Sequence, residues 1–140
     1  MSAADVEFLR RMFEDLAGPE IAGPTEMETV EPWWHSEIEY VEDPKWPGSS
    51  AYRGRAEVLR CWNSYLEIFS TVRMEVEDVV DAGDEVVVMV RVSGISDGAE
   101  VPFDQLWGYV CRLRDGKLGY YRAYTDPEEA LADAGVSSSS

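Results

Sequence analysis

The feature that most constrains the fold of this chain is a change of hydrophobic period near Thr71. Before it, apolar residues recur at spacings of three and four, which is typical of helices that bury one face. After it, apolar residues such as Val72 and Met74 alternate with polar ones, which is typical of half-buried strands. Helices therefore precede a sheet, and this order favours an α+β fold with helices covering one face of a curved sheet.

The first half of the chain is predicted to hold helices, a short strand and a loop. Thr25, followed three residues later by Glu28, predicts a capping box at the start of the second helix. The loop is rich in proline, glycine and serine, and it contains Trp46. The predicted helices span residues 4–17, 25–30 and 58–69, the strand spans residues 38–41, and the loop spans residues 44–50.

The second half is predicted to form an antiparallel meander followed by a terminal helix. Asp115-Gly116 is a strong signal for a two-residue hairpin, and Asp126 is predicted to cap the last helix. The strands are expected from residue 71 onward and over residues 86–92, 101–114 and 118–125. In the last strand, strict alternation would place Leu118 on the face opposite Tyr121. Because apolar groups occur on both faces, we expect the outer face to be covered by a second copy in a homodimer.

Composition limits the partners of this fold. The chain has 140 residues, and 12 Lys and Arg against 28 Asp and Glu give a formal net charge of −16. This charge argues against binding to nucleic acid or to anionic membranes. We expect one domain over residues 1–136, a disordered serine tail over residues 137–140, and a cytoplasmic location, since the N-terminus lacks a signal-peptide core. Cys61 and Cys111 are expected to be reduced.

The order of elements and several short motifs resemble the nuclear-transport-factor-2-like superfamily, which includes ketosteroid isomerase and SnoaL-like polyketide cyclases. The motifs are Val-Glu-Asp-Pro at residues 41–44, Tyr-Arg-Gly-Arg at residues 52–55, Arg-Asp-Gly-Lys at residues 114–117 and Arg-Ala-Tyr at residues 122–124. The resemblance implies a cone-shaped, strongly curved antiparallel sheet whose concave face is covered by N-terminal helices. It does not imply one activity, because this fold carries several chemistries.

Ketosteroid isomerase offers three positions for comparison with this chain. Its general base matches Asp43, and a partly desolvated carboxylate near Trp46 would have a raised pKa that suits proton transfer. An Asp before Pro also commonly starts a turn, so a purely structural role for Asp43 stays open as the alternative. The two oxyanion donors of that family fall on Phe13, which has no proton to donate, and on Tyr109, which has one. The resemblance therefore argues against authentic steroid isomerisation.

The same resemblance implies a pocket that accepts a small apolar or weakly polar molecule. Besides Asp43 and Tyr109 as catalytic candidates, the expected lining residues are Phe13, Trp46, Val58, Cys61, Trp62, Tyr65, Trp107, Tyr121 and Ala123. No cofactor and no metal are expected. The acidic group that includes Glu42 lacks the spacing of a calcium loop, and we assign it to a solvated face.

Two functional hypotheses follow. In the first, the chain is a cofactor-independent isomerase or cyclase that moves a proton, with Asp43 as base and Tyr109 as hydrogen-bond donor. In the second, the same cone is a non-catalytic ligand-binding or dimerisation module. An epoxide-hydrolase site built from Arg91, Asp104 and Asp126 is a weaker alternative.

Overall fold

A computed structural model of the chain describes residues 2–17, 21, 23–96 and 102–136. The elements are α1 (Ala3–Ala17), α2 (Met27–Val30), β1 (Trp34–Val41), β2 (Ala51–Arg53), α3 (Arg55–Leu66), β3 (Phe69–Asp81), β4 (Val86–Ser96), β5 (Pro102–Arg114), β6 (Lys117–Tyr124) and α4 (Pro127–Asp133). The predicted order is confirmed, and β2 is an additional strand. The predicted tail at residues 137–140 lies outside the described residues. Within the described ranges, no helix is long and apolar enough to cross a membrane.

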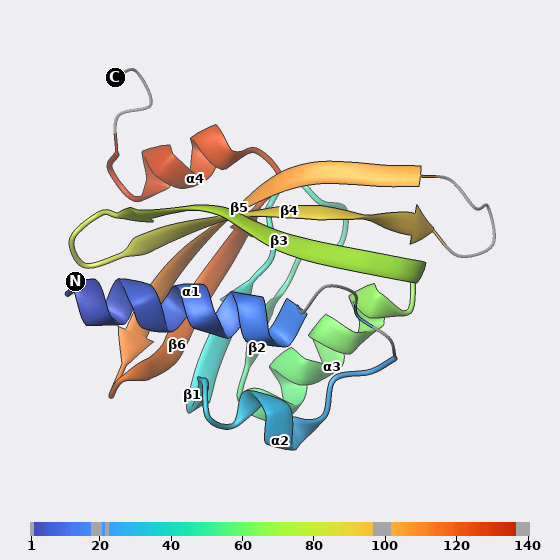
Figure 1. The fold of residues 1–140 in the computed structure, drawn as a ribbon, viewed down its shortest axis with the longest axis horizontal. Helices are drawn as coiled ribbons and strands as arrows, with labels where there is room; N and C mark the ends of the chain where they lie inside the picture. The colour runs from blue at the N-terminus through green and yellow to red at the C-terminus, as the bar shows by residue number, and fades with distance from the viewer. Residues whose placement is uncertain (1, 18–20, 22, 97–101, 137–140) are drawn as a thin grey trace.

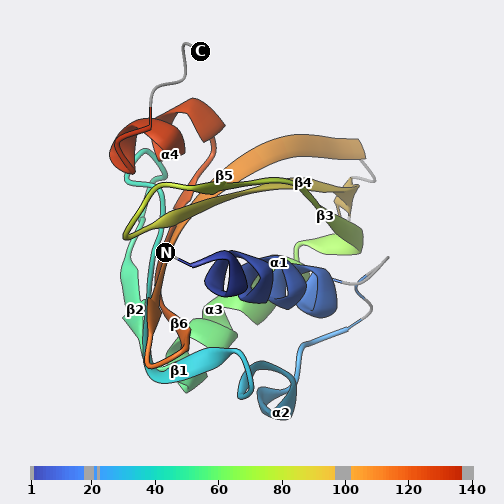
Figure 2. The same cartoon turned by 60° about the vertical axis from the view of Figure 1, so that its left-hand side comes forward.

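The strands form one sheet in the order β2-β1-β6-β5-β4-β3. Figures 1 and 2 show that this sheet bends strongly, and that α1 and α3 lie within its concave side while α4 lies outside. The expected α+β fold with a curved, helix-covered sheet is therefore confirmed. The sheet is mixed rather than antiparallel throughout, because β1 and β6 run parallel.

The concave face carries the main core. Leu9, Met12 and Phe13 of α1 are buried in one cluster with Val88 and Val90 of β4. Figure 2 shows α1 lying against the inner side of the sheet. The alternation in β4 sends Val87 to a second cluster on the outer face, as the period of two requires.

A break in the register of β5 and β6 corrects one prediction about the faces. Arg112 pairs with Tyr120, but Leu113 pairs with Leu118, so Gly119 is the extra residue of a bulge. Leu118 therefore joins the same inner core as Tyr121, whereas strict alternation placed them on opposite faces. A side chain at Gly119 would have its Cβ 2.5 Å from the Cβ of Arg114, so the bulge requires glycine.

Helix α4 covers part of the outer face. Its residues Ala130 and Leu131 are buried against Val87 and Val110 of the sheet. The approach is close, because a Cβ added at Gly108 would lie 2.7 Å from the Cβ of Ala130. The apolar residues on the outer side of β5 and β6 are thus covered, at least in part, by a helix of the same chain.

Local signals at the ends of the elements had mixed outcomes. The hairpin at Asp115 and Gly116 is confirmed, with φ angles of 51° and 78° at these residues. Asp126 caps α4 by accepting a hydrogen bond from the Glu128 amide at 3.0 Å, also as predicted. The predicted capping box at Thr25 is wrong, because α2 begins after Glu26 without a side-chain cap. The Thr25 hydroxyl instead accepts a hydrogen bond from the Trp62 indole at 2.9 Å.

Candidate functional site

A cavity of about 270 Å³ lies between the concave face of the sheet, α3 and the loop after β1. This volume lies just below the range of about 300–1,000 Å³ that is typical of small-molecule sites. Ile68 lines the cavity and is 53% exposed, so the cavity reaches the surface beyond the C-terminal end of α3. The lining residues are Tyr40, Trp46, Trp62, Tyr65, Leu66, Ile68, Phe69, Val72, Met74, Val92, Phe103, Gln105, Trp107, Tyr109, Tyr121 and Thr125.

Aromatic rings in mutual contact form much of the wall. Tyr40 of β1 stacks on Tyr121 of β6 with 4.4 Å between ring centroids. Trp46, from the loop after β1, lies 5.0 Å from Trp107 of β5 and 5.8 Å from Tyr65 of α3. Because each of these rings packs against a ring from another element, the wall is held in place by both the sheet and the helix.

The polar atoms of the wall are mainly tyrosine hydroxyls. Burial raises the pKa of Tyr40, Tyr65, Tyr109 and Tyr121, so all four remain protonated at neutral pH. The indole N–H of Trp107 is buried without a hydrogen-bond partner among the described residues, and it is a further donor. No lysine, arginine or histidine belongs to the described lining. The wall therefore suits an uncharged molecule that carries a few oxygen atoms.

The carboxylate of Glu42 is hydrogen-bonded to Tyr65 of the cavity wall. Its Oε2 accepts a hydrogen bond from the Tyr65 hydroxyl. Its Oε1 accepts from the Ser50 amide at 3.1 Å and from the Tyr52 hydroxyl at 3.2 Å. Sequence reasoning missed Glu42 by assigning it to a solvated face. Its spacing of two from Tyr40 was the available signal, because alternation places both residues on one side of the strand.

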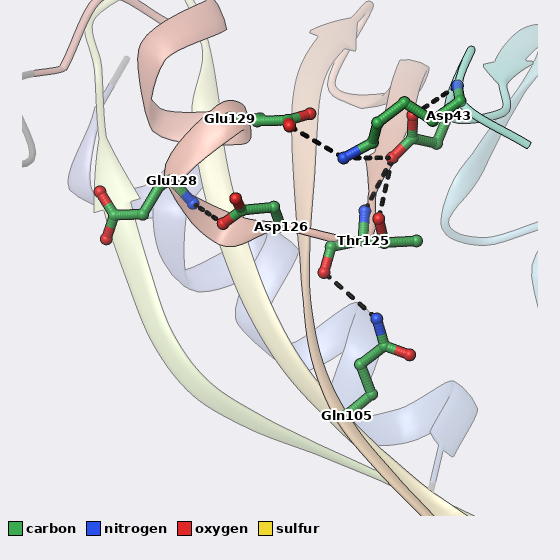
Figure 3. A network of polar contacts seen from close by, with 7 residues as sticks. Asp43, Gln105, Thr125, Asp126, Glu128 and Glu129 are labelled. Atoms are coloured by element: carbon green, nitrogen blue, oxygen red, sulfur yellow. Dashed lines mark hydrogen bonds and ion pairs between the residues drawn. The ribbon is translucent and has the colours of Figure 1, made fainter.

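Asp43 lies outside the cavity lining, in a network that joins the loop after β1 to β6 and α4 (Figure 3). Its side chain is fully buried. One oxygen accepts from the Lys45 amide at 2.9 Å, and the other accepts from the Thr125 amide at 3.0 Å and the Thr125 hydroxyl at 3.2 Å. Lys45 also pairs with Glu129 of α4 at 2.8 Å.

The electrostatics of Asp43 differ from the sequence-based expectation. Burial raises the pKa of this carboxyl, but hydrogen bonds from Thr125 and Lys45, together with the charge of Lys45, outweigh burial and lower it below its ordinary value. The expectation was a raised pKa, because sequence reasoning counted desolvation but could not see the donors. In this geometry, Asp43 is a fully hydrogen-bonded carboxylate that links three segments.

The remaining predicted residues separate into two groups. Trp46, Trp62, Tyr65, Trp107, Tyr109 and Tyr121 line the cavity. Phe13, Val58, Cys61 and Ala123 lie in the adjoining core instead. Phe13 of α1 lies 5.5 Å from Tyr109 between ring centroids, so it supports the wall from behind. Both cysteines are buried and free.

Only two of the three residues of the weaker epoxide-hydrolase alternative, Arg91 and Asp104, are in contact. Arg91 forms ion pairs with Glu77 at 2.6 Å and with Asp104 at 3.0 Å, at positions that alternate with the inward-facing Val90 and Val92. Asp126 caps α4. In the part of the chain that the structure describes, no three His, Cys, Asp or Glu residues are grouped so that they could hold a metal ion.

Comparison with known proteins agrees with this geometry. The family model of the SnoaL-like domain matches residues 9–121, and the chain belongs to this family. A search of curated protein sequences finds no significant match.

Solved structures with the same fold cover nearly the whole chain. A candidate SnoaL-like polyketide cyclase from Jannaschia sp. CCS1 has 21% identity and a TM-score of 0.73, over 91% of this chain and 89% of that one. A hypothetical protein with a ketosteroid isomerase-like fold from Catenulispora acidiphila DSM 44928, in complex with trimethylamine, has 18% identity and a TM-score of 0.67 over 94% of each chain. TerC, co-crystallised with polyporic acid, has 15% identity and a TM-score of 0.70, over 94% of this chain and 98% of that one. At these identities the comparison establishes the fold alone.

Proposed function

We propose that the cone binds one small, uncharged, ring-containing molecule that carries oxygen substituents. The observation that carries this proposal is the cavity of about 270 Å³ with an aromatic wall and protonated tyrosine hydroxyls. Flat apolar rings gain contact area against such a wall, and oxygen atoms find hydrogen-bond partners there. Two proteins of the same fold, those solved with trimethylamine and with polyporic acid, support a role in binding small molecules.

Proton transfer on a molecule in the same cavity is the second candidate function. The observation that favours it is the position of Thr125, which lines the cavity and also holds Asp43 by two hydrogen bonds. Tyr109 would donate a hydrogen bond to a developing oxyanion. Asp43 would act as base only after the contact with Thr125 opens. If this function holds, Asp43→Asn abolishes turnover in a screen of enolisable ketones while ligand binding survives; turnover at the wild-type rate excludes Asp43 as the base.

A binding experiment with a cavity-filling variant tests the primary proposal. Val92 lines the cavity and is 4% exposed, so Val92→Phe places a ring inside it. We expect 2-methoxynaphthalene, followed by its fluorescence, to bind the wild-type protein and to lose about tenfold or more in affinity with this variant. The matched control is Ile95→Phe, because Ile95 is 41% exposed and lies outside the lining. Equal affinity for the wild type and Val92→Phe would contradict the proposal.

The homodimer through the outer sheet face stays part of the proposal. The ion pairs of Arg91 with Glu77 and Asp104 are on this face, and charged residues there suit a polar interface. Arg91→Glu would place three acidic side chains together, and we expect it to convert a dimer to a monomer in light scattering. A wild-type protein that is monomeric at all concentrations would rule the dimer out.

A further inference from the structure

We propose that Tyr65 and Glu42 form a proton-accepting pair that selects ligands carrying a hydroxyl hydrogen, such as phenols and enols. This inference rests on the proposed binding function and names the chemistry that the cavity prefers. It begins with the one hydrogen of the Tyr65 hydroxyl, which is donated to Oε2 of Glu42. A phenolic hydroxyl has only one hydrogen, so this group is left with an oxygen that accepts.

The hydroxyl of Tyr40 extends this series of hydrogen bonds in the same direction, toward Glu42. Tyr65 also has a side-chain hydrogen bond with Tyr40, and this bond lowers the pKa of Tyr65, against the larger effect of burial. Because the one hydrogen of the Tyr65 hydroxyl is donated to Glu42, Tyr40 is the donor in this bond. Both hydroxyls therefore donate toward Glu42, and the Tyr65 oxygen keeps a second lone pair with which it accepts from a ligand in the cavity.

Glu42 is held so that the hydrogen bond from the Tyr65 hydroxyl keeps this direction. Ser50 and Tyr52 donate to Oε1, which leaves Oε2 for Tyr65. Burial is the first cause that raises the pKa of Tyr52, to about 12, so this hydroxyl remains a donor at neutral pH. Three donors converge on the Glu42 carboxylate. Reversal of the hydrogen bonds between the hydroxyls would leave one of these donors unpaired.

The two neighbouring carboxylates accept hydrogen bonds from different residues of the cavity wall. The donors to Asp43 are the amides of Lys45 and Thr125 and the Thr125 hydroxyl. Glu42 instead accepts from a phenol of the cavity wall, the Tyr65 hydroxyl. When a ligand O–H proton moves to the Tyr65 oxygen, the Tyr65 proton moves to Oε2 of Glu42. The products are a ligand oxyanion and a neutral Glu42, with Tyr65 restored.

Two probes of nearly the same shape test the pair. 2-Naphthol carries a hydroxyl hydrogen, and 2-methoxynaphthalene does not. We expect the wild-type protein to bind 2-naphthol about tenfold more tightly, which corresponds to one hydrogen bond. Because excited 2-naphthol is a strong acid, we also expect naphtholate emission from the bound probe, since a proton acceptor lies beside it.

The variants remove either the acceptor oxygen or the carboxylate. We expect Tyr65→Phe and Glu42→Gln to abolish both the preference for 2-naphthol and the naphtholate emission, so that each variant binds 2-naphthol and 2-methoxynaphthalene with similar affinity. Glu39→Gln is the matched control, because Glu39 lies on the same strand but pairs with Arg53. If Glu42→Gln fails to fold, Tyr65→Phe decides the test, since it deletes a single oxygen.

The outcomes separate this inference from the proposed function. If the wild type binds both probes equally, or if Tyr65→Phe keeps the preference and the emission, the pair does not select the ligand and only this inference fails. If neither probe binds the wild type, the proposed binding function and this inference both fail.

Discussion

The carboxylate of Asp43 accepts hydrogen bonds from both the amide and the hydroxyl of Thr125, at 3.0 Å and 3.2 Å. Thr125 directly follows β6 and lines the cavity, while Asp43 directly precedes the Pro-Lys-Trp segment that contributes Trp46 to the wall. The contact therefore fixes the loop after β1 against the end of β6. This relationship makes Asp43 a structural residue in the folded protein, whatever its role in chemistry.

Removal of this carboxylate is predicted to destabilise the protein. Asp43→Ala leaves the amides of Lys45 and Thr125 without their acceptor in a buried position, so we expect a loss of about 2–3 kcal/mol in the free energy of unfolding. In thermal unfolding this corresponds to a decrease of about 6–10 °C in Tm. Asp84→Ala, in the exposed β3–β4 turn, is the control and should change Tm by little. Equal Tm values for the two variants would show that the network around Asp43 contributes nothing to stability.

The same carboxylate predicts a pH dependence. The pKa of Asp43 in the folded protein lies below the reference value of 3.8, so its contribution to stability is present above that pH. The contribution is lost as the pH falls through the lower, folded-state pKa. We therefore expect the difference in unfolding free energy between the wild type and Asp43→Asn to narrow as the pH falls below the reference value of 3.8. Urea unfolding at a series of pH values measures this; a difference that stays constant with pH would mean that the folded-state pKa is not lowered.

Binding in the cavity is predicted to change the fluorescence of particular tryptophans. Trp46 and Trp107 lie 5.0 Å apart in the wall, so a ligand should alter their emission. Trp33 instead packs on Phe8 and donates to Asp15, away from the lining. We expect Trp46→Phe and Trp107→Phe to reduce the signal change with 2-methoxynaphthalene, and Trp33→Phe to preserve it. A signal that depends on Trp33 alone would place binding elsewhere.

Helix α4 is predicted to depend on the absence of a side chain at residue 108. Gly108→Ala would bring two Cβ atoms to 2.7 Å, so α4 must shift, and we expect a cost of about 1–3 kcal/mol. Amide hydrogen exchange should become faster in Pro127–Asp133 more than in α1. The variant Ala130→Gly removes the opposing Cβ, so the double variant should lose less stability than the sum of the two single changes. Simple additivity would indicate that these residues do not clash.

Charge on the ligand is predicted to matter as well. The described lining includes no cationic side chain, so a carboxylate would lose its hydration without gaining an ion pair. We expect 2-naphthoate to bind at least about tenfold more weakly than 2-methoxynaphthalene, as measured by competition against the latter. Tighter binding of the anion would contradict the proposed ligand class.

The sequence was sufficient for the order of elements and for most of the aromatic wall, because both follow from local rules. Odd positions of the fifth strand, such as Trp107 and Tyr109, face inward because alternation in a strand is strict. The same rule failed for Leu118, where a bulge at Gly119 shifts the register. A bulge depends on the partner strand, which a single strand's pattern does not reveal.

The polar part of the site was harder to predict, since it depends on contacts between distant residues. The donors to Asp43 include Thr125, which is 82 positions away in the chain. Glu42 was assigned to solvent because its partner Tyr65 lies on a helix 23 positions later. For two adjacent acidic residues of similar chemistry, only the tertiary structure decides which wall residue each one contacts: Tyr65 for Glu42 and Thr125 for Asp43.

The parallel pairing of β1 with β6 has a consequence for how the chain acquires its cavity. β6 lies between β1 and β5 in the sheet, so the segment that ends at Val41 pairs with one that begins at Lys117. Such non-local pairing is slow, because a long loop must close before its contacts form. During synthesis, β1 and β2 are made long before β6, so β1 lacks its second neighbouring strand until β6 has been synthesised. The cavity is therefore one of the last features to form, and a chain interrupted before β6 would leave the edge of β1 exposed to aggregation.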